Sequence, residues 1–266
     1  MPRYFLFSLV LFVILISFAC KPQSEAVTPD GAKQILQLRG YEINAKGYFK
    51  AILAEDLAAI RTFFQAGFDI NTQNEKGETP LTFAMSCCET KTIKVLLEKV
   101  DVNQRDKDGT TALFLAMKKN KSDIIDLILE KNPDVNVPGK DDLTLLHVAA
   151  TKNDLELIQT LIDRGANVNA ISKSNGSIPM IESCIGSPPQ TEAIKLFLSK
   201  GADINQAGNN KATCLMYVAS AGHAELVSEL LKAGADPKLK DKDGMTALAW
   251  AAKYKRDNVV ALLKGK

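Results

Sequence analysis

The sequence has little of what catalytic and metal sites are built from. Two histidines, His147 and His223, occur in 266 residues. There is no serine nucleophile elbow, no phosphate-cradling glycine loop and no His-Glu metalloprotease pair. No pair of carboxylates recurs on one helix face as general acid–base chemistry would need. The sequence therefore predicts no enzyme and no cofactor, and with no third ligand near either histidine it predicts no zinc site.

An excess of either charge is also missing. The chain carries 33 Lys and Arg against 31 Asp and Glu, and removing residues 1–19 takes away only Arg3. This balance gives no general attraction for nucleic acid. The five cysteines follow no spacing typical of a disulfide scaffold or of a zinc-binding set.

Long apolar runs are absent except at the N-terminus. There, Tyr4–Phe18 is apolar over 15 residues, which is shorter than the roughly 20 residues of a membrane-spanning helix. Arg3 precedes the run, and the small residues Ser17 and Ala19 lie at its end. These flanks predict a secretory signal peptide over residues 1–19. We therefore expect the chain to be exported.

Cleavage after Ala19 would make Cys20 the first residue. The sequence Ser17-Phe18-Ala19-Cys20 resembles the lipobox of bacterial lipoproteins, with Ser17 where that motif usually carries Leu, a departure that spirochaete lipoboxes show. The resemblance implies lipidation at Cys20 and a membrane anchor in the cell envelope, facing the periplasm or the cell surface. An ordinary signal peptide cut at the same bond is the alternative. Residues 20–31, with two prolines and a glycine, predict a flexible tether.

The rest of the chain repeats one pattern six times. A glycine-tipped turn leads to a threonine, and an apolar helix follows. A self-similar period of this length is typical of stacked repeats. The anchors are spaced by 32 to 35 residues and are Thr79, Thr111, Thr144, Ile178, Thr213 and Thr246.

Each repeat has a physical rationale. A hydroxyl before the first helix accepts backbone N–H groups that have no partner within the helix, and Pro80 or Pro179 fits the first helical turn. Small residues such as Ala84 and Ala116 allow neighbouring first helices to approach closely. The apolar faces of the second helices can be buried only against the next repeat, which predicts a solenoid.

Several segments are similar to the ankyrin repeat. They are Glu78–Leu81, Thr144–Ala150, Ala221–Val227, and the repeat endings Arg164–Asn169 and Lys200–Asn205. The resemblance covers about Glu42 to Lys264. It implies an all-α ankyrin-repeat solenoid of helix-turn-helix units with β-hairpin finger loops over residues 32–266. Residues 32–74 would be a degenerate N-terminal capping unit, and residues 75–266 the six repeats.

The fourth repeat is predicted to be the weakest. Ile178 stands where a capping hydroxyl belongs, a loss of about 1 kcal/mol. The turn between its helices is also lengthened at residues 186–190. Both histidines occupy positions where the family uses His to tie backbone together, so the resemblance implies structural roles for them.

The cysteines permit different interpretations. A disulfide between Cys184 and Cys214 needs Cα atoms within about 7 Å, and matched positions of neighbouring repeats are farther apart, so buried free thiols are expected there. Cys87 and Cys88 fall in the turn between the helices of the first repeat. They are either redox-active or ordinary turn residues.

Ankyrin proteins, as the resemblance implies, bind protein partners along the finger tips and the concave face. Lysines recur at both places here and suggest an acidic partner, although lysine is also the default residue of an exposed turn. Phe83, Tyr217 and Trp250 share one helix register, either as anchors or as framework. The candidate contact residues are Lys76, Lys107, Lys118, Lys119, Lys140, Lys152, Tyr217, Trp250, Lys253 and Tyr254.

The sequence thus predicts a monomeric, envelope-anchored protein-binding module without catalytic activity. Two alternatives stay open. One is a dedicated inhibitor or immunity-type protein for a single toxin or enzyme. The other is a periplasmic protective protein linked to oxidant defence, which rests on similarity to such ankyrin proteins and on Cys87 and Cys88.

Overall fold

The structure is a computed structural model that describes residues 27–139, 142–174, 176–186 and 188–265. The predicted signal peptide and Cys20 lie outside these residues. Contacts divide the chain into two compact units, Met1–Ile70 and Asn71–Lys266, and each is described by itself. Within the described residues, no helix combines the length and apolarity needed to cross a membrane.

The first unit contains three described helices. They are α2 (Pro29–Leu38), α3 (Ala45–Leu53) and α4 (Leu57–Gln65). Asn44 and Asp56 cap α3 and α4, because their side-chain oxygens accept the N–H groups of Gly47 and Ala59.

The core of the first unit is aromatic. The rings of Tyr48 and Phe63 lie 5.1 Å apart between centroids, and Phe68 lies 5.5 Å from each of them. Both Tyr48 and Phe63 are fully buried. Rings at these separations add packing energy beyond the area they bury, which stabilises the three described helices of this unit.

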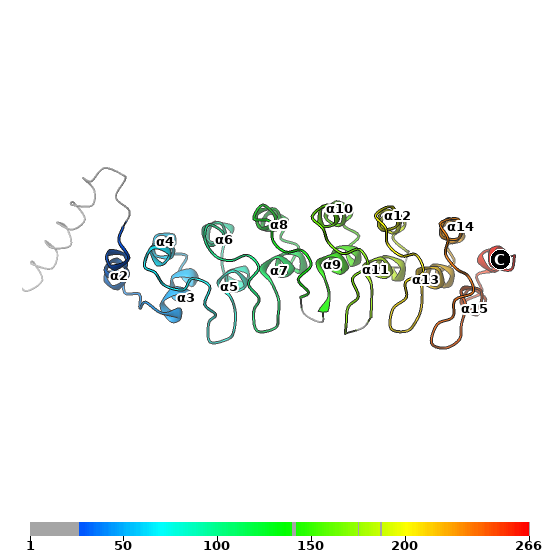
Figure 1. Cartoon of the computed structure of the whole chain (residues 1–266), viewed down its shortest axis with the longest axis horizontal. Helices are drawn as coiled ribbons and strands as arrows, with labels where there is room; N and C mark the ends of the chain where they lie inside the picture. The colour runs from blue at the N-terminus through cyan, green and yellow to red at the C-terminus, as the bar shows by residue number, and fades with distance from the viewer. Residues whose placement is uncertain (1–26, 140–141, 175, 187, 266) are drawn as a thin grey trace, which may run out of the picture. The chain divides into compact units, whose positions relative to one another are not determined.

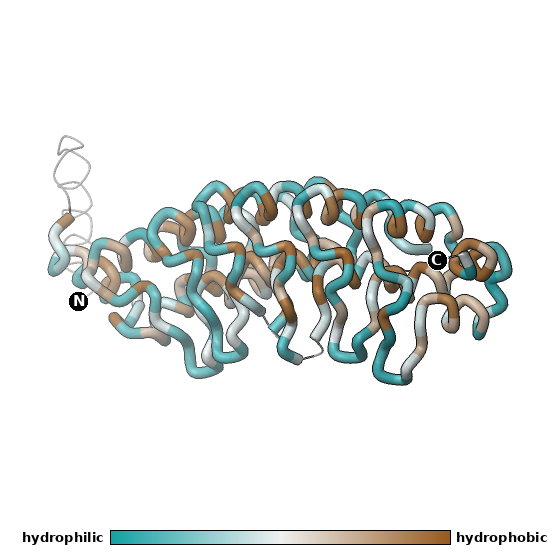
Figure 2. Tube along the Cα trace, turned by 45° about the vertical axis from the view of Figure 1, so that its right-hand side comes forward, coloured by the Kyte–Doolittle hydropathy of each residue, from teal (hydrophilic) through white to brown (hydrophobic). Residues whose placement is uncertain are grey.

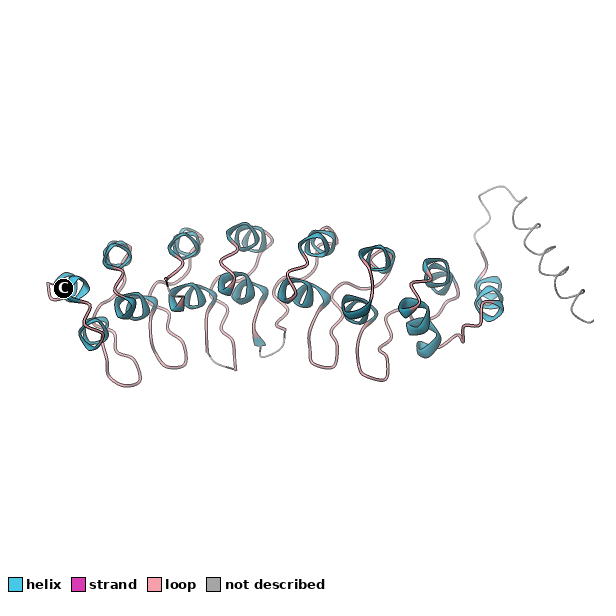
Figure 3. Ribbon diagram, turned by 180° about the vertical axis from the view of Figure 1, so that it is seen from behind, coloured by secondary structure: helices cyan, strands magenta, loops and turns pink. Residues whose placement is uncertain are grey.

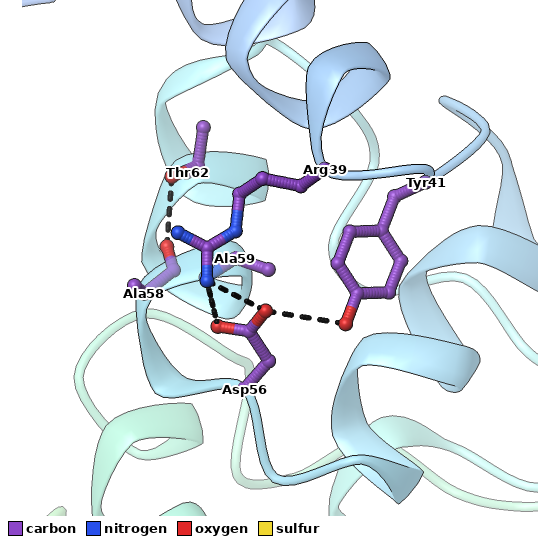
Figure 4. A network of polar contacts seen from close by, with 6 residues as sticks. All are labelled: Arg39, Tyr41, Asp56, Ala58, Ala59 and Thr62. Atoms are coloured by element: carbon purple, nitrogen blue, oxygen red, sulfur yellow. Dashed lines mark hydrogen bonds and ion pairs between the residues drawn. The ribbon is translucent and has the colours of Figure 1, made fainter. Parts of the chain in front are cut away.

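An ion pair joins the end of α2 to the start of α4 (Figure 4). Arg39 donates from one nitrogen, Nη2, to both carboxylate oxygens of Asp56 at 2.8 Å, and the Tyr41 hydroxyl donates to Oδ2 at 3.2 Å. Burial alone would raise the pKa of Asp56, but the hydrogen bonds from Ala59 and Arg39 outweigh it and hold that pKa below its ordinary value. Asp56 is thus both a helix cap and a link between two helices.

The described residues of the second unit form a stack of six helix pairs (Figure 1). The first helix of each pair lies in one row and the second in another, while the loops between pairs project from the inner row. We call the first helices inner and the second helices outer. The inner helices are α5 (Pro80–Cys87), α7 (Ala112–Lys118), α9 (Leu145–Thr151), α11 (Pro179–Ile185), α13 (Cys214–Ala221) and α15 (Ala247–Lys253). The outer helices are α6 (Thr90–Leu96), α8 (Ser122–Leu129), α10 (Leu155–Asp163), α12 (Thr191–Ser199), α14 (Ala224–Lys232) and α16 (Asp257–Leu263).

The finger loops precede the inner helices and have the shape of hairpins without regular strands. Asp106 N–H donates to Thr110 O at 3.0 Å, and Asp241 N–H donates to Met245 O at the same distance. Figure 3 colours these loops as turns, and the described residues contain one isolated antiparallel bridge, Ala207 to Thr213. The ends of the finger loops are mostly hydrophilic, whereas the helices carry both hydrophilic and hydrophobic residues (Figure 2). The predicted helical solenoid with finger loops is confirmed.

Threonine hydroxyls cap three of the inner helices. The hydroxyls of Thr79, Thr111 and Thr246 each accept a backbone N–H three residues on. Ile178 leaves α11 without a side-chain cap, as predicted. Thr213 also makes no cap hydrogen bond, and its buried hydroxyl has no hydrogen-bond partner among the described residues. Two consecutive inner helices therefore begin without a side-chain cap.

A ladder of asparagines joins each repeat to the next. The side-chain oxygen of one asparagine accepts a backbone N–H from the following repeat, at 2.8 or 2.9 Å. At the corresponding place in the fifth repeat stands Lys238, whose side chain cannot accept a hydrogen bond. The ladder residues are Asn71, Asn103, Asn136, Asn169 and Asn205.

The expectation of free thiols at Cys184 and Cys214 is wrong. The two residues form a disulfide with their Cα atoms 5.4 Å apart, within the range a disulfide needs. Cys184 lies in the last turn of α11 and Cys214 begins α13. Cys184 and Cys214 do not occupy matched positions in their repeats. The larger Cα separation expected between matched positions therefore does not hold for this pair. The bond ties together α11 and α13, which both begin without a side-chain cap.

Candidate binding surface

One register of the inner helices forms a partly exposed stripe. It lies four residues after each repeat anchor and is apolar in five of six repeats. Val148 is nearly buried, whereas the other members are half-buried. The stripe is Phe83, Leu115, Val148, Glu182, Tyr217 and Trp250. Glu182 accepts a hydrogen bond from the Ser177 hydroxyl and interrupts the stripe, which leaves Tyr217 and Trp250 as a separate aromatic pair.

Trp250 is fixed by its own finger loop. Its indole Nε1 donates to Asp241 Oδ2 at 2.6 Å. Its ring stacks on Tyr254, with centroids 5.7 Å apart and planes 8° from parallel. The Lys253 ammonium lies 4.6 Å from the Trp250 centroid, within cation–π range. The predicted residues Trp250, Lys253 and Tyr254 therefore form one cluster.

Tyr217 is fixed in the same manner. Asn210 in its finger loop donates from Nδ2 to the Tyr217 hydroxyl at 2.8 Å. The carbonyl of Asn210 accepts the backbone N–H of Lys242 at 2.9 Å, so the fifth and sixth finger loops are joined. Both aromatic side chains are therefore held by finger loops that are bonded to each other.

The predicted lysines divide into two groups. Lys76 and Lys107 are exposed on finger loops, and Lys118 and Lys253 are exposed at the ends of α7 and α15. These ammonium groups are available to a partner. Lys140 lies outside the described residues.

Lys119 and Lys152 have structural contacts. Lys119 Nζ donates to Met85 O at 3.3 Å, and Lys152 Nζ donates to Met117 O. Both carbonyls belong to the last turn of the preceding inner helix, where a cation offsets the helix dipole. Each lysine thus joins its repeat to the one before, and this role supports packing rather than partner contact.

His147 has the structural role that the sequence indicated. Thr144 N–H donates to His147 Nδ1 at 3.2 Å, and Nε2 lies 3.0 Å from Ser177 O. Because Nδ1 accepts, Nε2 carries the proton and donates to Ser177 O. Burial lowers the pKa of His147, whereas the hydrogen bond to Ser177 and the charge of Glu182 raise it. The effect of burial is the larger, so the pKa lies below its ordinary value. The neutral ring ties a helix start to the next finger loop.

The described residues offer no cluster of three or more metal-binding side chains. A hollow of about 480 Å³ lies between α14 and α16, lined by Leu231, Lys232, Asp236 and Leu262 among others. It lies on the outer helices, away from the aromatic pair. The inner surface thus presents partly exposed rings together with exposed ammonium groups.

Sequence reasoning missed Asn210 and Asp241. Nothing in the sequence pattern shows that a side chain of the finger loop reaches the helix position four residues after the anchor. The weak signal is that an aromatic residue and a finger Asn or Asp occur together in the fifth and sixth repeats.

Comparison with known proteins gives a consistent result. Residues 49–139, 132–208 and 189–266 match the family described as ankyrin repeats (3 copies). The ankyrin repeat domain of Bcl-3 superposes with a TM-score of 0.66 at 25% identity, covering 79% of this chain and 96% of that one.

Curated relatives are much longer than this chain. Phosphocholine transferase AnkX of Legionella pneumophila is 29% identical over 62% of this chain, which spans 16% of AnkX. A putative ankyrin repeat protein of Rickettsia felis is 35% identical over 30% of this chain and 22% of its own length. The similarity therefore concerns the repeats and not the whole of those proteins.

Proposed function

This chain belongs to the ankyrin-repeat family, and from that membership we propose a specific role. The fold is generally a non-catalytic binding scaffold. We propose that the protein is an exported, membrane-anchored member that binds protein partners through the inner surface of its fifth and sixth repeats. Tyr217 and Trp250 are the proposed anchors, and Tyr254 and Lys253 complete the contact.

The observation that carries this proposal is the fixation of both aromatic rings. Asn210 and Asp241 hold Tyr217 and Trp250 from neighbouring finger loops. A side chain already held in place loses little conformational entropy when a partner binds. Tyr and Trp are also the residues that most often carry binding energy at protein interfaces.

The charges around the pair favour an acidic partner. Four lysines of the sixth repeat are exposed, namely Lys240, Lys242, Lys253 and Lys255. The exposed acidic residues among them in the sequence are Asp243 and Asp257. Asp241 is nearly buried and is engaged with Trp250. A local excess of cations next to exposed rings suits an acidic surface that also offers an apolar contact.

Export and anchoring are supported by two features. The N-terminal segment has the pattern of a signal peptide, and cleavage after Ala19 would make Cys20 the first residue. The disulfide between Cys184 and Cys214 is of the kind found in proteins of oxidising compartments. The same lipidated chain would face the periplasm or the cell surface.

Affinity capture tests the binding surface. The full-length protein, immobilised in detergent, is exposed to envelope extract, and retained proteins are identified by mass spectrometry. We expect Trp250→Ala and Tyr217→Ala to reduce capture of the partner. Phe83→Ala is the matched control, because Phe83 has the same register in the first repeat. Equal losses in all three variants, or in none, would refute the proposed surface.

Charge reversal tests the acidic partner. Lys253→Glu should weaken capture, and salt should weaken capture by the wild type. Lys76→Glu changes the same charge on the first finger loop and serves as control. If Lys253→Glu binds as well as the wild type, the partner contact does not depend on this charge.

The number of partners separates the main proposal from its alternative. The fixed aromatic pair also suits a dedicated inhibitor, which would retain one stoichiometric protein even at moderate salt. Several weak, salt-released proteins would instead indicate a general scaffold.

A labelled fatty acid tests the membrane anchor. We expect the label to be incorporated into the wild type but not into Cys20→Ala, and equal labelling of the two would refute lipidation at Cys20.

A further inference from the structure

Two adjacent cysteines lie at the end of the first inner helix. Cys87 is the last residue of α5, and Cys88 is its C-cap. Cys87 is exposed and Cys88 is half-buried. Their sulfur atoms are 2.9 Å apart. Both lie far along the stack from Tyr217 and Trp250, so they have no part in the binding surface proposed above.

Neither packing nor turn geometry explains this pair. Neither side chain belongs to the buried core. In the corresponding turns of the second, third and fifth repeats, Asn120, Asn153 and Gly222 have positive φ, as a left-handed turn requires. Cys88 instead has an extended backbone, with φ −118° and ψ 160°. The first repeat therefore turns differently and places two thiols side by side.

Two lysine ammonium groups reach the carbonyl end of α5. Lys119 and Lys121 both direct their ammonium groups at Met85 O, at 3.3 and 3.1 Å. Met85 precedes Cys87 by two residues in the last turns of α5. Thiol–disulfide exchange requires access to the attacking sulfur, and Cys87 is exposed.

A disulfide between Cys87 and Cys88 would differ from the one in the fourth and fifth repeats. Consecutive Cα atoms across a trans peptide bond are about 3.8 Å apart, whereas disulfides normally join Cα atoms at least about 4.4 Å apart. Cys184 and Cys214 lie within the normal range, at 5.4 Å, and both are buried. Strained and exposed disulfides are readily reduced, and unstrained buried ones resist reduction.

We propose that Cys87 and Cys88 form a reversible dithiol site that exchanges with low-molecular-weight disulfides, while Cys184–Cys214 stays a permanent structural bond. The Cys87 thiolate attacks one sulfur of a disulfide R–S–S–R′, and R′–S⁻ leaves and takes up a proton. The Cys88 thiolate then attacks Cys87 Sγ, and R–S⁻ leaves with the second proton. Two protein thiols are oxidised to one disulfide, and one external disulfide is reduced to two thiols.

The order of attack follows from exposure. Cys87 is the more exposed sulfur, so it forms the mixed disulfide, and Cys88 resolves it. Because the ring that closes is strained, it opens again when external thiols are in excess. The oxidation state of the pair therefore follows the ratio of disulfide to thiol around the protein.

The test equilibrates the full-length protein with mixtures of reduced and oxidised glutathione, then alkylates the remaining thiols and locates every bond by peptide mass spectrometry. The wild type should gain a Cys87–Cys88 disulfide in oxidising mixtures and lose it in reducing ones, while Cys184–Cys214 stays bonded throughout. Cys88→Ser should stop at a glutathione adduct on Cys87. Cys87→Ser should lose most of the reactivity.

Circular dichroism of each variant checks that the helices are retained, which is expected for substitutions at an exposed turn. Three results would overturn the proposal. They are two separate glutathione adducts without ring closure, equal reactivity of Cys87→Ser and Cys88→Ser, and a pair that stays reduced in the most oxidising mixture.

Discussion

Asp241 and Trp250 are joined by a 2.6 Å hydrogen bond from the indole Nε1 to carboxylate Oδ2. The other oxygen, Oδ1, accepts the backbone N–H groups of Asp243 and Met245 at 2.9 Å. One carboxylate thus shapes the last finger loop and orients the ring beneath it. The finger loops are therefore parts of the proposed binding surface even where they do not touch a partner.

Replacing Asp241 should loosen the sixth repeat. Asp241→Ala removes three hydrogen bonds to a nearly buried carboxylate. We expect a loss of about 1–3 kcal/mol in the free energy of unfolding, measured by denaturant titration. Trp250 is the only tryptophan, so its fluorescence should shift toward that of a solvent-exposed indole. Asp243→Ala, at an exposed position of the same loop, should leave both measurements nearly unchanged, and equal effects of the two substitutions would contradict the assignment.

The asparagine ladder should stabilise the junctions between repeats. Asn136 accepts from Asn167 N–H at 2.9 Å and donates to Gly165 O at 3.0 Å. Asn136→Ala should therefore cost about 1–2 kcal/mol, again read from denaturant unfolding. Lys238→Ala replaces the residue at the end of the ladder and should cost much less. A similar cost at both positions would show that the ladder bonds contribute little.

Stability should depend on the protonation of His147. Its pKa is lowered in the folded protein by burial, so the unfolded chain binds the proton more readily. The contribution of His147 is therefore complete above the ordinary histidine pKa of about 6.5 and is lost progressively as pH falls from there toward the lowered value. His147→Gln should remove this part of the pH dependence measured by unfolding at several pH values. His223→Gln, at an exposed histidine, should retain it, and a wild-type slope in His147→Gln would contradict the prediction.

The fourth repeat should depend on its disulfide. The bond closes a loop with a sequence separation of 30 between Cys184 and Cys214, and such loops stabilise by about 2–4 kcal/mol. With both cysteines replaced by alanine, we expect amide hydrogen exchange to become fastest in α11 and α12. With the disulfide intact, the exchange rates of the fourth repeat should differ less from those of the third and fifth repeats. Protection of the fourth repeat equal to its neighbours in the alanine variant would refute the weakness predicted from Ile178.

The capping residues show which contacts can be predicted from neighbouring residues in the sequence. Thr79, Thr111 and Thr246 cap their helices as their position predicts, because the acceptor and the N–H group lie three residues apart in one segment. Thr213 has the same place in the pattern but makes no cap bond. Its surroundings, which include the disulfide at Cys214, come from the preceding repeat, and no local rule describes them.

The candidate contact residues show the same division. Sequence placed Lys118 and Lys119 together at the end of one helix, and both are exposed. The structure gives Lys119, but not Lys118, a carbonyl of the preceding repeat. That difference depends on the approach of two helices more than 30 residues apart in the chain. The sequence around Lys118 and Lys119 therefore cannot show which lysine contacts the preceding repeat and which is available to a partner.

The sequence by itself determined the period, the helix pairs, the glycine turns and the family, because each of these depends on residues within one repeat. Only the tertiary structure decided that Cys184 bonds to Cys214, that Lys152 joins two repeats, and that Asn210 and Asp241 hold the aromatic pair. These contacts depend on the tilt and spacing between repeats and on side chains that reach across them. Neighbouring repeats repeat the same pattern in sequence, yet it is their packing in space that distinguishes a structural lysine or cysteine from one that a partner can reach.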